Sequence, residues 1–240
     1  MRISGATVLI TGASSGIGAA TARAVAAAGG RAVLTGRDGD RLAEVAAETG
    51  GVAFVADITG PVEIPEAVDV LVNNAGVGWA GPFEEMTDAD IDRLIAVNLT
   101  APIRLTRALV PGMVERARGH VVFVASIAGA TGVRHEAVYA ATKAGLIYFA
   151  DSLRYELGGS GVGVSVVLPG VVDTPFFDRR GRPYDRRRPA PIPAERVART
   201  IVTVIERDRA EAYQPGWMRI PARLHGGAPA LFRRFAGRYG

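Results

Sequence analysis

Short apolar runs recur along the first 168 residues of the chain, separated by segments with a helical pattern. Continuous apolar runs of about four to eight residues, rich in β-branched side chains, are typical of strands buried on both faces. Strands that alternate with helices favour a parallel sheet with right-handed crossovers. The predicted strands cover residues 7–11, 31–35, 52–56, 68–72, 120–126 and 162–168.

The predicted helices begin after turn or capping residues and end near glycine or proline. The longest helical pattern begins at Thr87 or Asp88, and we expect Pro102 to bend it. Between residues 57 and 73 the chain is too short, and too interrupted by proline, for a long crossover helix. The helical segments run from the first glycine loop to Ala28, then over 87–113, 139–157 and 193–206, with a short amphipathic stretch at 231–235.

These elements predict one domain. Of the 240 residues, 48% are hydrophobic, which is enough for a full core. Because we find no internal repeat and no linker, we predict a single α/β domain over residues 1–240, a doubly wound parallel sheet with helices on both faces. A loop at about 171–192 and a C-terminal extension at about 215–240 belong to this domain.

The first predicted strand leads directly into a glycine-rich loop that opens a helix. In a strand–loop–helix–strand unit, such glycines let the backbone turn sharply and approach a pyrophosphate at the helix N-terminus. The alternative is a tight turn without a ligand. The spacing is G-x-x-x-G-x-G, and the candidate dinucleotide contacts are Gly12, Ser14, Ser15, Gly16, Ile17 and Gly18.

The end of the second strand indicates which dinucleotide is preferred. An acidic residue there would bind the ribose 2′-hydroxyl of NAD. Gly36 leaves space instead, and Arg37 can pair with the 2′-phosphate of NADP. The alternatives are a solvated Arg37, or an Asp38 that binds the ribose. We therefore expect NADP, with NAD as a possible substitute.

Tyr139 and Lys143 are four residues apart, on one face of a predicted helix. A neighbouring ammonium favours the phenolate, so we expect Lys143 to lower the pKa of Tyr139 toward the range of proton transfer. Lys143 is the single lysine among the 28 lysine and arginine residues of the chain. Lysine and arginine differ in shape and donor geometry, so this position indicates a specific need for an ammonium.

Other candidates lie at or near the carboxyl ends of the predicted strands, where open α/β sheets bind ligands. Ser126 ends the most strand-like run of the chain. Asn98 is a polar residue in an otherwise apolar-faced helix, and its alternative is an exposed amide on the helix surface. The remaining candidates after strands are Asp57, Ile58, Asn74, Ala75, Gly76, Pro169 and Gly170.

Composition narrows the chemistry further. Cysteine is absent, which excludes thiol nucleophiles, disulfides and zinc–thiolate sites and fits a reducing cytoplasm. We find no signal peptide and no membrane span, and we expect no metal site. The net charge of +4 is local, because the segment 179–188 alone holds six arginines. This run indicates either a solvated lid or a surface for an anionic partner.

Together these motifs resemble the short-chain dehydrogenase/reductase family over nearly the full length of the chain. The loop at 12–18 resembles its glycine loop, and residues 73–76 resemble the turn beside its cofactor. Ser126 precedes Tyr139 by thirteen residues, as in the family. The resemblance implies a Rossmann-type sheet of about seven strands, with Asn98, Ser126, Tyr139 and Lys143 as the catalytic residues.

The resemblance also implies the role of each residue. Tyr139 would exchange a proton with the substrate, and Lys143 would lower its pKa and hold the nicotinamide ribose. Ser126 would donate a hydrogen bond to the substrate oxygen. Asn98 would hold a water molecule that relays protons to Lys143. Pro169, Gly170, Val172 and Thr174 would lie at the nicotinamide.

We expect a hydrophobic ketone, aldehyde or alcohol as the substrate, because the predicted lining is apolar and aromatic. The alternatives are a non-catalytic NADP sensor and a nucleic-acid binder that uses the arginine loop, although we expect no nucleic acid. The family also implies a homodimer or homotetramer. The expected substrate contacts are Gly78, Trp79, Ser126, Ile127, His135, Tyr139, Val171, Phe176 and Phe177.

Overall fold

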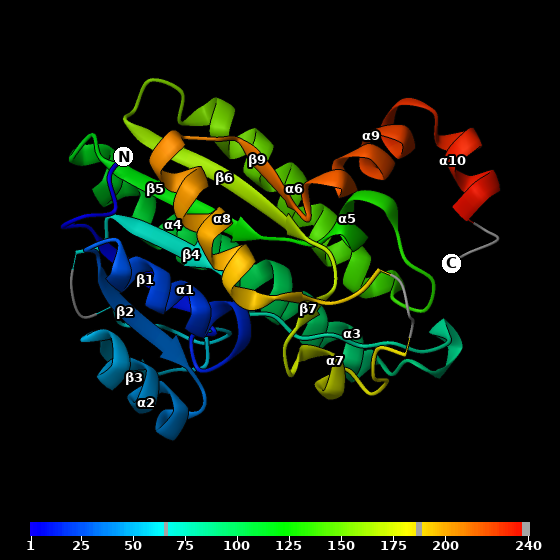
Figure 1. Cartoon of the computed structure of the whole chain (residues 1–240), viewed down its shortest axis with the longest axis horizontal. Helices are drawn as coiled ribbons and strands as arrows, with labels where there is room; N and C mark the ends of the chain where they lie inside the picture. The colour runs from blue at the N-terminus through cyan, green and yellow to red at the C-terminus, as the bar shows by residue number, and fades with distance from the viewer. Residues whose placement is uncertain (65–66, 186–188, 237–240) are drawn as a thin grey trace.

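The computed structural model describes residues 1–64, 67–185 and 189–236. Among these residues, seven strands form one parallel sheet in the order β3-β2-β1-β4-β5-β6-β9 (Figure 1). This confirms the predicted doubly wound α/β fold. The strands are β1 (Thr7–Thr11), β2 (Arg31–Gly36), β3 (Val52–Val55), β4 (Val70–Asn73), β5 (Gly119–Val124), β6 (Val162–Pro169) and β9 (Glu211–Gln214).

Helices cover both faces of the sheet because each buried strand sends apolar side chains to both sides. In β1, Val8 and Ile10 belong to one core cluster, whereas Leu9 belongs to the other. The helices over the first cluster are α1 (Gly16–Ala27), α2 (Gly39–Thr49) and α8 (Ala194–Arg207), and those over the second are α4 (Ala101–Glu115) and α6 (Ala137–Glu156) (Figure 1).

The direction of winding reverses beside β1. The chain builds β1, β2 and β3 outward, and then returns to place β4 on the other side of β1. Such a reversal opens a crevice at the carboxyl ends of the two strands, where doubly wound sheets bind ligands. The glycine loop follows β1 and the Asn74–Gly76 turn follows β4, so both border this crevice.

The connection between β3 and β4 contains no helix in its described residues, 56–64 and 67–69, as the sequence predicted. Instead, Ile58 and Val68 are buried, and Val62 and Ile64 pack beside them. These apolar side chains join the same core cluster as Leu9, Leu105 and Leu146. The described residues of this connection therefore cover the sheet with apolar side chains but without a helix.

The segment predicted as one long helix is divided in two. α3 (Asp88–Ile95) leads into a π-helical turn, η2 (Ala96–Thr100), which is followed by α4. Pro102 lies in the first turn of α4, directly after the π-helical turn, and it lacks the N–H that would donate back into that turn. The irregularity therefore lies next to Pro102, and the bend expected there stays a prediction. A π-turn inside a helix often marks a functional site.

The predicted strands and helices otherwise keep their places within a few residues, but the shorter elements were not predicted. β9 is a four-residue edge strand, and α9 (Arg219–Gly227) precedes the expected helix near the C-terminus, α10 (Pro229–Ala236). The other short elements are η1 (Phe83–Glu85), α5 (Ile127–Thr131), β7 (Val172–Asp173), α7 (Phe176–Arg179), β8 (Ile192–Pro193) and η3 (Gly216–Met218).

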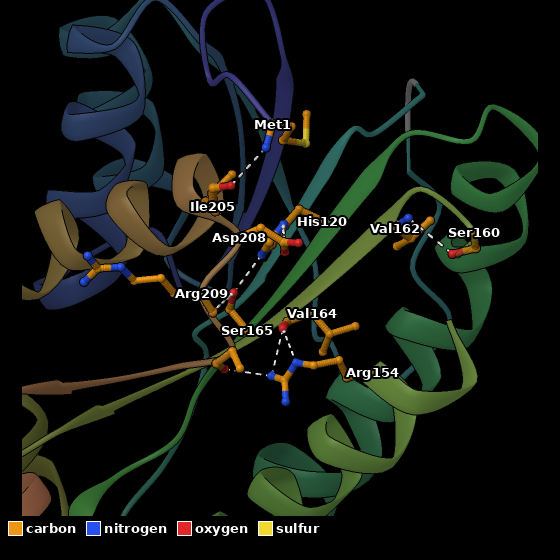
Figure 2. Close-up of polar contacts among 11 residues, drawn as sticks. Met1, His120, Arg154, Ser160, Val162, Val164, Ser165, Ile205, Asp208 and Arg209 are labelled. Carbon is orange, nitrogen blue, oxygen red and sulfur yellow. Dashed lines mark hydrogen bonds and ion pairs between the residues drawn. The ribbon is translucent and has the colours of Figure 1, made fainter. Parts of the chain in front are cut away.

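A network of polar side chains lies at the amino-terminal side of the sheet (Figure 2). His120 lies in β5, and its Nε2 is 2.7 Å from the hydroxyl oxygen of Ser165 in β6. The Ser165 hydroxyl donates to the Arg209 carbonyl at 2.7 Å, and His120 Nδ1 lies 3.8 Å from Asp208 Oδ1. The network joins two central strands to the turn between α8 and β9.

Candidate active site

Hydrogen bonds hold the two loops at the crevice together. The Asn74 side-chain amide donates to the carbonyls of Thr11 and Gly12 at 2.8 and 3.3 Å. The Thr11 hydroxyl oxygen accepts the backbone N–H groups of Asn74 and Ala75 at 3.0 and 2.9 Å. Gly12 has a positive φ of 66°, which suits glycine. This bonding fixes the glycine loop against the Asn74–Gly76 turn.

The N-terminus of α1 is suited to an anion. Ser15 is the N-cap residue, and its side chain makes no capping hydrogen bond. The first turn of α1 contains no acidic residue. The partial positive charge of the helix end and its unpaired N–H groups can therefore bind a pyrophosphate. Ser14, Gly16 and Ile17 line the same cavity, so the residues of the loop fit a dinucleotide.

After β2 the chain places an arginine, Arg37, and then an aspartate, Asp38, whose carboxylate is already hydrogen-bonded. Asp38 caps α2, where Oδ1 accepts the Arg41 N–H at 3.2 Å and Oδ2 lies 3.5 Å from Arg41 Nε. Arg37 is exposed and lines the cavity together with Gly36 and Asp57. Asp38 also lines the cavity, but its carboxylate is engaged in capping α2, whereas Arg37 presents its guanidinium at the same end of the cavity.

Ser126, Tyr139 and Lys143 meet at the carboxyl end of β5. Ser126 caps the short helix α5, and its hydroxyl oxygen accepts the Ala128 N–H at 3.1 Å. Tyr139 and Lys143 lie one turn apart on α6 and are 8% and 4% exposed. Lys143 Nζ donates to the Val124 carbonyl at 2.9 Å and lies 5.9 Å from the centre of the Tyr139 ring.

Burial controls the pKa values of this pair. It raises the pKa of Tyr139 well above its ordinary value, and a hydrogen bond from Ser126 offsets only part of the effect. It also lowers the pKa of Lys143 to about 8. The expected net lowering of the Tyr139 pKa is therefore wrong for the protein alone, because the loss of hydration has the largest effect. Tyr139 is protonated at neutral pH.

Asn98 is fully buried, so the alternative of an exposed helix-surface amide is wrong. The π-turn directs its side chain to the segment that follows Gly76. Asn98 Oδ1 accepts the Val77 N–H at 2.8 Å, and Nδ2 donates to the Val77 carbonyl at 2.9 Å. Nδ2 also lies 3.3 Å from the Thr142 hydroxyl, beside Lys143. The side chain thus connects α6 with the turn after β4.

One cavity of about 890 Å³ joins the glycine loop, the end of β2 and the Ser126–Tyr139–Lys143 cluster. Its lining includes almost every residue that the sequence suggested, far apart as they are along the chain. The predicted residues that line it are Gly12, Ser14, Ser15, Gly16, Ile17, Arg37, Asp57, Ile58, Asn74, Ala75, Gly76, Gly78, Ser126, Ile127, His135, Tyr139, Lys143, Pro169, Gly170, Val171, Val172, Thr174, Phe176 and Phe177.

Three predicted residues lie outside this cavity. Gly18 packs inside the loop, since a Cβ there would lie 2.2 Å from the Gly12 carbonyl oxygen. Asn98 is buried behind the cavity, as described above. Trp79 lines a separate cavity of about 70 Å³, which His135 and Tyr139 also border. Gly18 shapes the glycine loop, and Asn98 lies close to Lys143, since a Cβ on Gly76 would meet both side chains within 3.4 Å, so its part in a proton relay stays a prediction.

The substrate end is aromatic. The Phe176 ring centre lies 5.6 Å from that of Tyr139, and the rings of Phe177 and Tyr184 continue the row at 5.4 Å spacings. Tyr184 was not predicted, and neither was the ion pair between Glu136 and Arg180 that borders this row. Of the predicted arginine run, Arg186, Arg187 and Arg188 lie outside the described residues.

No group of three or more His, Cys, Asp or Glu side chains in the described part of the chain is arranged to hold a metal ion. The described helices likewise include none that is long and apolar enough to cross a membrane.

Comparison with known proteins agrees with this site. Residues 6–185 match the family model for short chain dehydrogenases. A ketoacyl reductase, HetN, of Nostoc sp. is 37% identical over 238 residues, which cover 87% of this chain and 78% of that protein. The chain therefore belongs to the short-chain dehydrogenase/reductase family, a class of oxidoreductases that act on CH–OH groups or the corresponding carbonyls with a nicotinamide dinucleotide.

Solved structures show the same fold. A short-chain dehydrogenase from Sphingobium yanoikuyae in complex with NADPH is 33% identical, with a TM-score of 0.81 and coverage of 88% of both chains. A family member from Burkholderia phymatum in complex with NAD is 25% identical, with a TM-score of 0.86 and coverage of 96% of both chains.

Proposed function

We propose that this oxidoreductase uses NADP(H) to interconvert a hydrophobic ketone or aldehyde and its alcohol, with Tyr139 as the general acid and base. The observation that carries the proposal is the single cavity of about 890 Å³. It brings an anion-binding helix end, a phenol–ammonium pair and an aromatic wall into one space. A site for a dinucleotide therefore continues into a site for an apolar carbonyl compound.

The proton chemistry uses three side chains. The dinucleotide, when bound, supplies or accepts a hydride. In reduction, the Tyr139 hydroxyl gives its proton to the carbonyl oxygen, and in oxidation the phenolate takes the proton of the alcohol. Ser126 donates a hydrogen bond to the same oxygen as negative charge develops there. Lys143, with a pKa of about 8, can supply or accept a proton near neutral pH.

The protonated state of Tyr139 suits it to act as the proton donor of reduction. A proton donor must carry its proton before the reaction, and burial keeps the phenol neutral. Oxidation of an alcohol begins with the phenolate, which is costly in this buried position.

The preference for NADP over NAD rests on Arg37. It is exposed at the mouth of the cavity, whereas the neighbouring Asp38 is engaged in capping α2. A Cβ on Gly36 would lie 3.6 Å from the Ser14 hydroxyl oxygen, so the end of β2 lies against the glycine loop. A guanidinium next to this loop is suited to a 2′-phosphate.

A homodimer built on α4 and α6 belongs to the same proposal. Tyr148 and Tyr155 on α6 are 72% and 83% exposed, and Val114 on α4 is 40% exposed. Large exposed side chains of this kind are enriched where subunits meet. The two other functions considered, a non-catalytic NADP sensor and a nucleic-acid binder, have less support. The sensor leaves the clustered Ser126 and Tyr139 unexplained, and nucleic-acid binding leaves the deep cavity unexplained.

Turnover of a panel of aromatic and aliphatic ketones, aldehydes and alcohols with NADPH and NADH tests the proposal. We expect reduction of at least one apolar carbonyl compound, faster with NADPH. Binding of NADPH without turnover of any member of the panel would support the sensor instead. Salt-sensitive binding of oligonucleotides, measured in parallel, would support the nucleic-acid binder.

A further inference from the structure

The Glu136–Arg180 ion pair lies next to the proposed proton donor. Glu136 precedes Tyr139 by three residues at the start of α6, and Arg180 follows α7. Their side chains are 14% and 9% exposed, far less than the half-exposed Arg23–Glu48 pair between α1 and α2. Two opposite charges buried together beside a cavity form a fixed part of its wall.

Arg180 holds several segments at once. Its guanidinium carbon lies 4.7 Å from the centre of the Phe177 ring, and its Nε donates to the Arg182 carbonyl at 2.9 Å. Its own carbonyl accepts the Ala80 N–H at 3.2 Å. A Cβ on Gly78 would lie 2.9 Å from the Cβ of Arg180, so the chain after β4 runs directly beneath it.

These contacts fix the aromatic wall over the proton donor. Phe176 and Phe177 stand at right angles to one another, with ring centres 5.4 Å apart, and Phe176 contacts Tyr139. Phe176 also limits the space above Gly78, where a Cβ would lie 2.8 Å from its ring. Without the ion pair, the segment after α7 would keep its apolar contacts but lose its anchor to α6.

We propose that Glu136 and Arg180 are positioning residues, which anchor the Phe176–Phe177 wall across the substrate end and balance the charge beside Tyr139. The inference rests on the proposed carbonyl chemistry. A wall of two rings next to the proton donor favours a substrate whose carbonyl carries a flat or extended apolar group. A small ketone that does not reach the wall depends less on the pair.

The pair acts on the proton donor through two opposite effects. The Glu136 carboxylate raises the pKa of Tyr139, and the Arg180 guanidinium lowers it. Lys143 lies on the same helix, with its Nζ 5.9 Å from the Tyr139 ring centre. The other charged or titratable side chains that line this part of the cavity are Arg93, Arg134, His135, Arg179, Arg182 and Asp185.

The test compares Glu136→Gln, Arg180→Met and the charge-swapped double variant Glu136→Arg/Arg180→Glu. Because burial holds the pKa of Tyr139 far above the pH range of an assay, the readout is the division of the effect between KM and kcat. We expect kcat/KM for an aryl ketone to drop about tenfold or more in both single variants, mainly through KM. The swapped variant recovers part of the loss.

Arg23→Met and Glu48→Gln are the matched controls, because they break an ion pair that does not border the cavity. Thermal unfolding shows whether a variant is destabilised. If the larger changes reduce folding, Arg180→Lys and Glu136→Asp, which keep the charges, replace them in the test. An unchanged KM for the aryl ketone in both single variants, or an equal loss for a small ketone that does not reach the wall, would overturn the inference. If the pair variants match the controls while Tyr139→Phe is inactive, only this inference fails. If Tyr139→Phe keeps its activity, the proposed function fails first.

Discussion

Both ends of the sheet carry a serine beside a titratable side chain, yet only one end is arranged for chemistry. At the amino-terminal side, Ser165, His120 and Asp208 are grouped in the order of a hydrolase triad (Figure 2). At the carboxyl side, Ser126 and Tyr139 meet beside Lys143 and border the large cavity. Residue types alone would favour the first group.

The two groups differ in which atom donates each hydrogen bond. Ser165 uses its only proton to donate to the Arg209 carbonyl, so its oxygen accepts the Nε2–H of His120. A catalytic histidine must instead accept the serine proton at Nε2. Ser165 is also fully buried and does not line the cavity. A satisfied polar group without access to a ligand stabilises the fold, whereas one that borders a cavity can bind a substrate.

Substitution of the proton donor is expected to have the largest effect. Tyr139→Phe removes one hydroxyl and keeps the ring that packs against Phe176. We expect carbonyl reduction to fall about a thousandfold or more while NADPH still binds, because the variant lacks the proton that the substrate oxygen needs. Steady-state rates and NADPH fluorescence titration measure the two effects. Ser165→Ala is the control at the other end of the sheet and should keep near-normal turnover.

The single lysine is the next position to test. Lys143→Arg keeps the charge but replaces a compact ammonium in a site where Nζ binds the Val124 carbonyl at 2.9 Å. We expect kcat to fall about 100-fold, since the planar head group cannot occupy the same position and the proton supply to Tyr139 is disturbed. A variant with normal kcat would show that any cation suffices. Arg118→Lys, in an ion pair remote from the cavity, is the control.

Cofactor preference should change by a smaller factor. Arg37→Asp replaces the cation at the end of β2 with a carboxylate, which repels a 2′-phosphate and can bind a ribose hydroxyl. We expect the NADPH/NADH ratio of kcat/KM to fall about 10- to 100-fold. Rates with both cofactors, measured for Arg37→Asp and for Arg199→Asp, an exposed position on α8 outside the cavity, provide the comparison. An unchanged ratio would remove the basis for NADP preference.

The network at the amino-terminal side predicts an effect of pH on stability without an effect on the proton donor. Burial lowers the pKa of His120 to about 4, against 6.5 for the exposed side chain. The unfolded chain therefore takes up a proton between these values and the folded protein does not. The contribution of His120 to the free energy of unfolding is complete above pH 6.5, and roughly 3 kcal/mol is lost as pH falls to 4.

Chemical denaturation of His120→Gln at pH 7 and pH 4.5 tests this effect. We expect the variant to be less stable at pH 7 but to lose less stability on acidification than the wild type. His225→Gln, at the other end of the molecule, should keep the acid sensitivity of the wild type. Equal acid sensitivity in His120→Gln would show that another group causes it.

The sequence predicted most of the fold because its signals are local. The apolar runs in β1, β2, β4, β5 and β6 and the loop at 12–18 need no knowledge of distant residues. β9 was missed because its four residues form an edge strand with little apolar pattern. The π-turn at Asn98 was missed because it depends on the partner at Val77, 21 residues earlier.

The residues of the site likewise fall into those that local sequence predicts and those that only the fold brings together. Ser126, Tyr139 and Lys143 could be recognised from spacing, whereas Glu136 and Arg180 are 44 residues apart and only the fold brings them together. The pKa of Tyr139 was predicted in the wrong direction because a sequence shows the neighbouring charge but not the burial of both groups. Sequence patterns do not show which side chains from distant elements are in contact, nor which of them lose their hydration on folding.

Transfer of deuterium from 4,4-dideuterated NADPH to an apolar ketone tests most directly where the chemistry takes place. Mass spectrometry of the alcohol product is compared for the wild type, Ser165→Ala and Tyr139→Phe. We predict a deuterium on the carbinol carbon with the wild type and with Ser165→Ala, and no product with Tyr139→Phe. Labelled alcohol from Tyr139→Phe at the wild-type rate, or its loss in a folded Ser165→Ala variant, would contradict the assignment of the active site to the carboxyl end of the sheet.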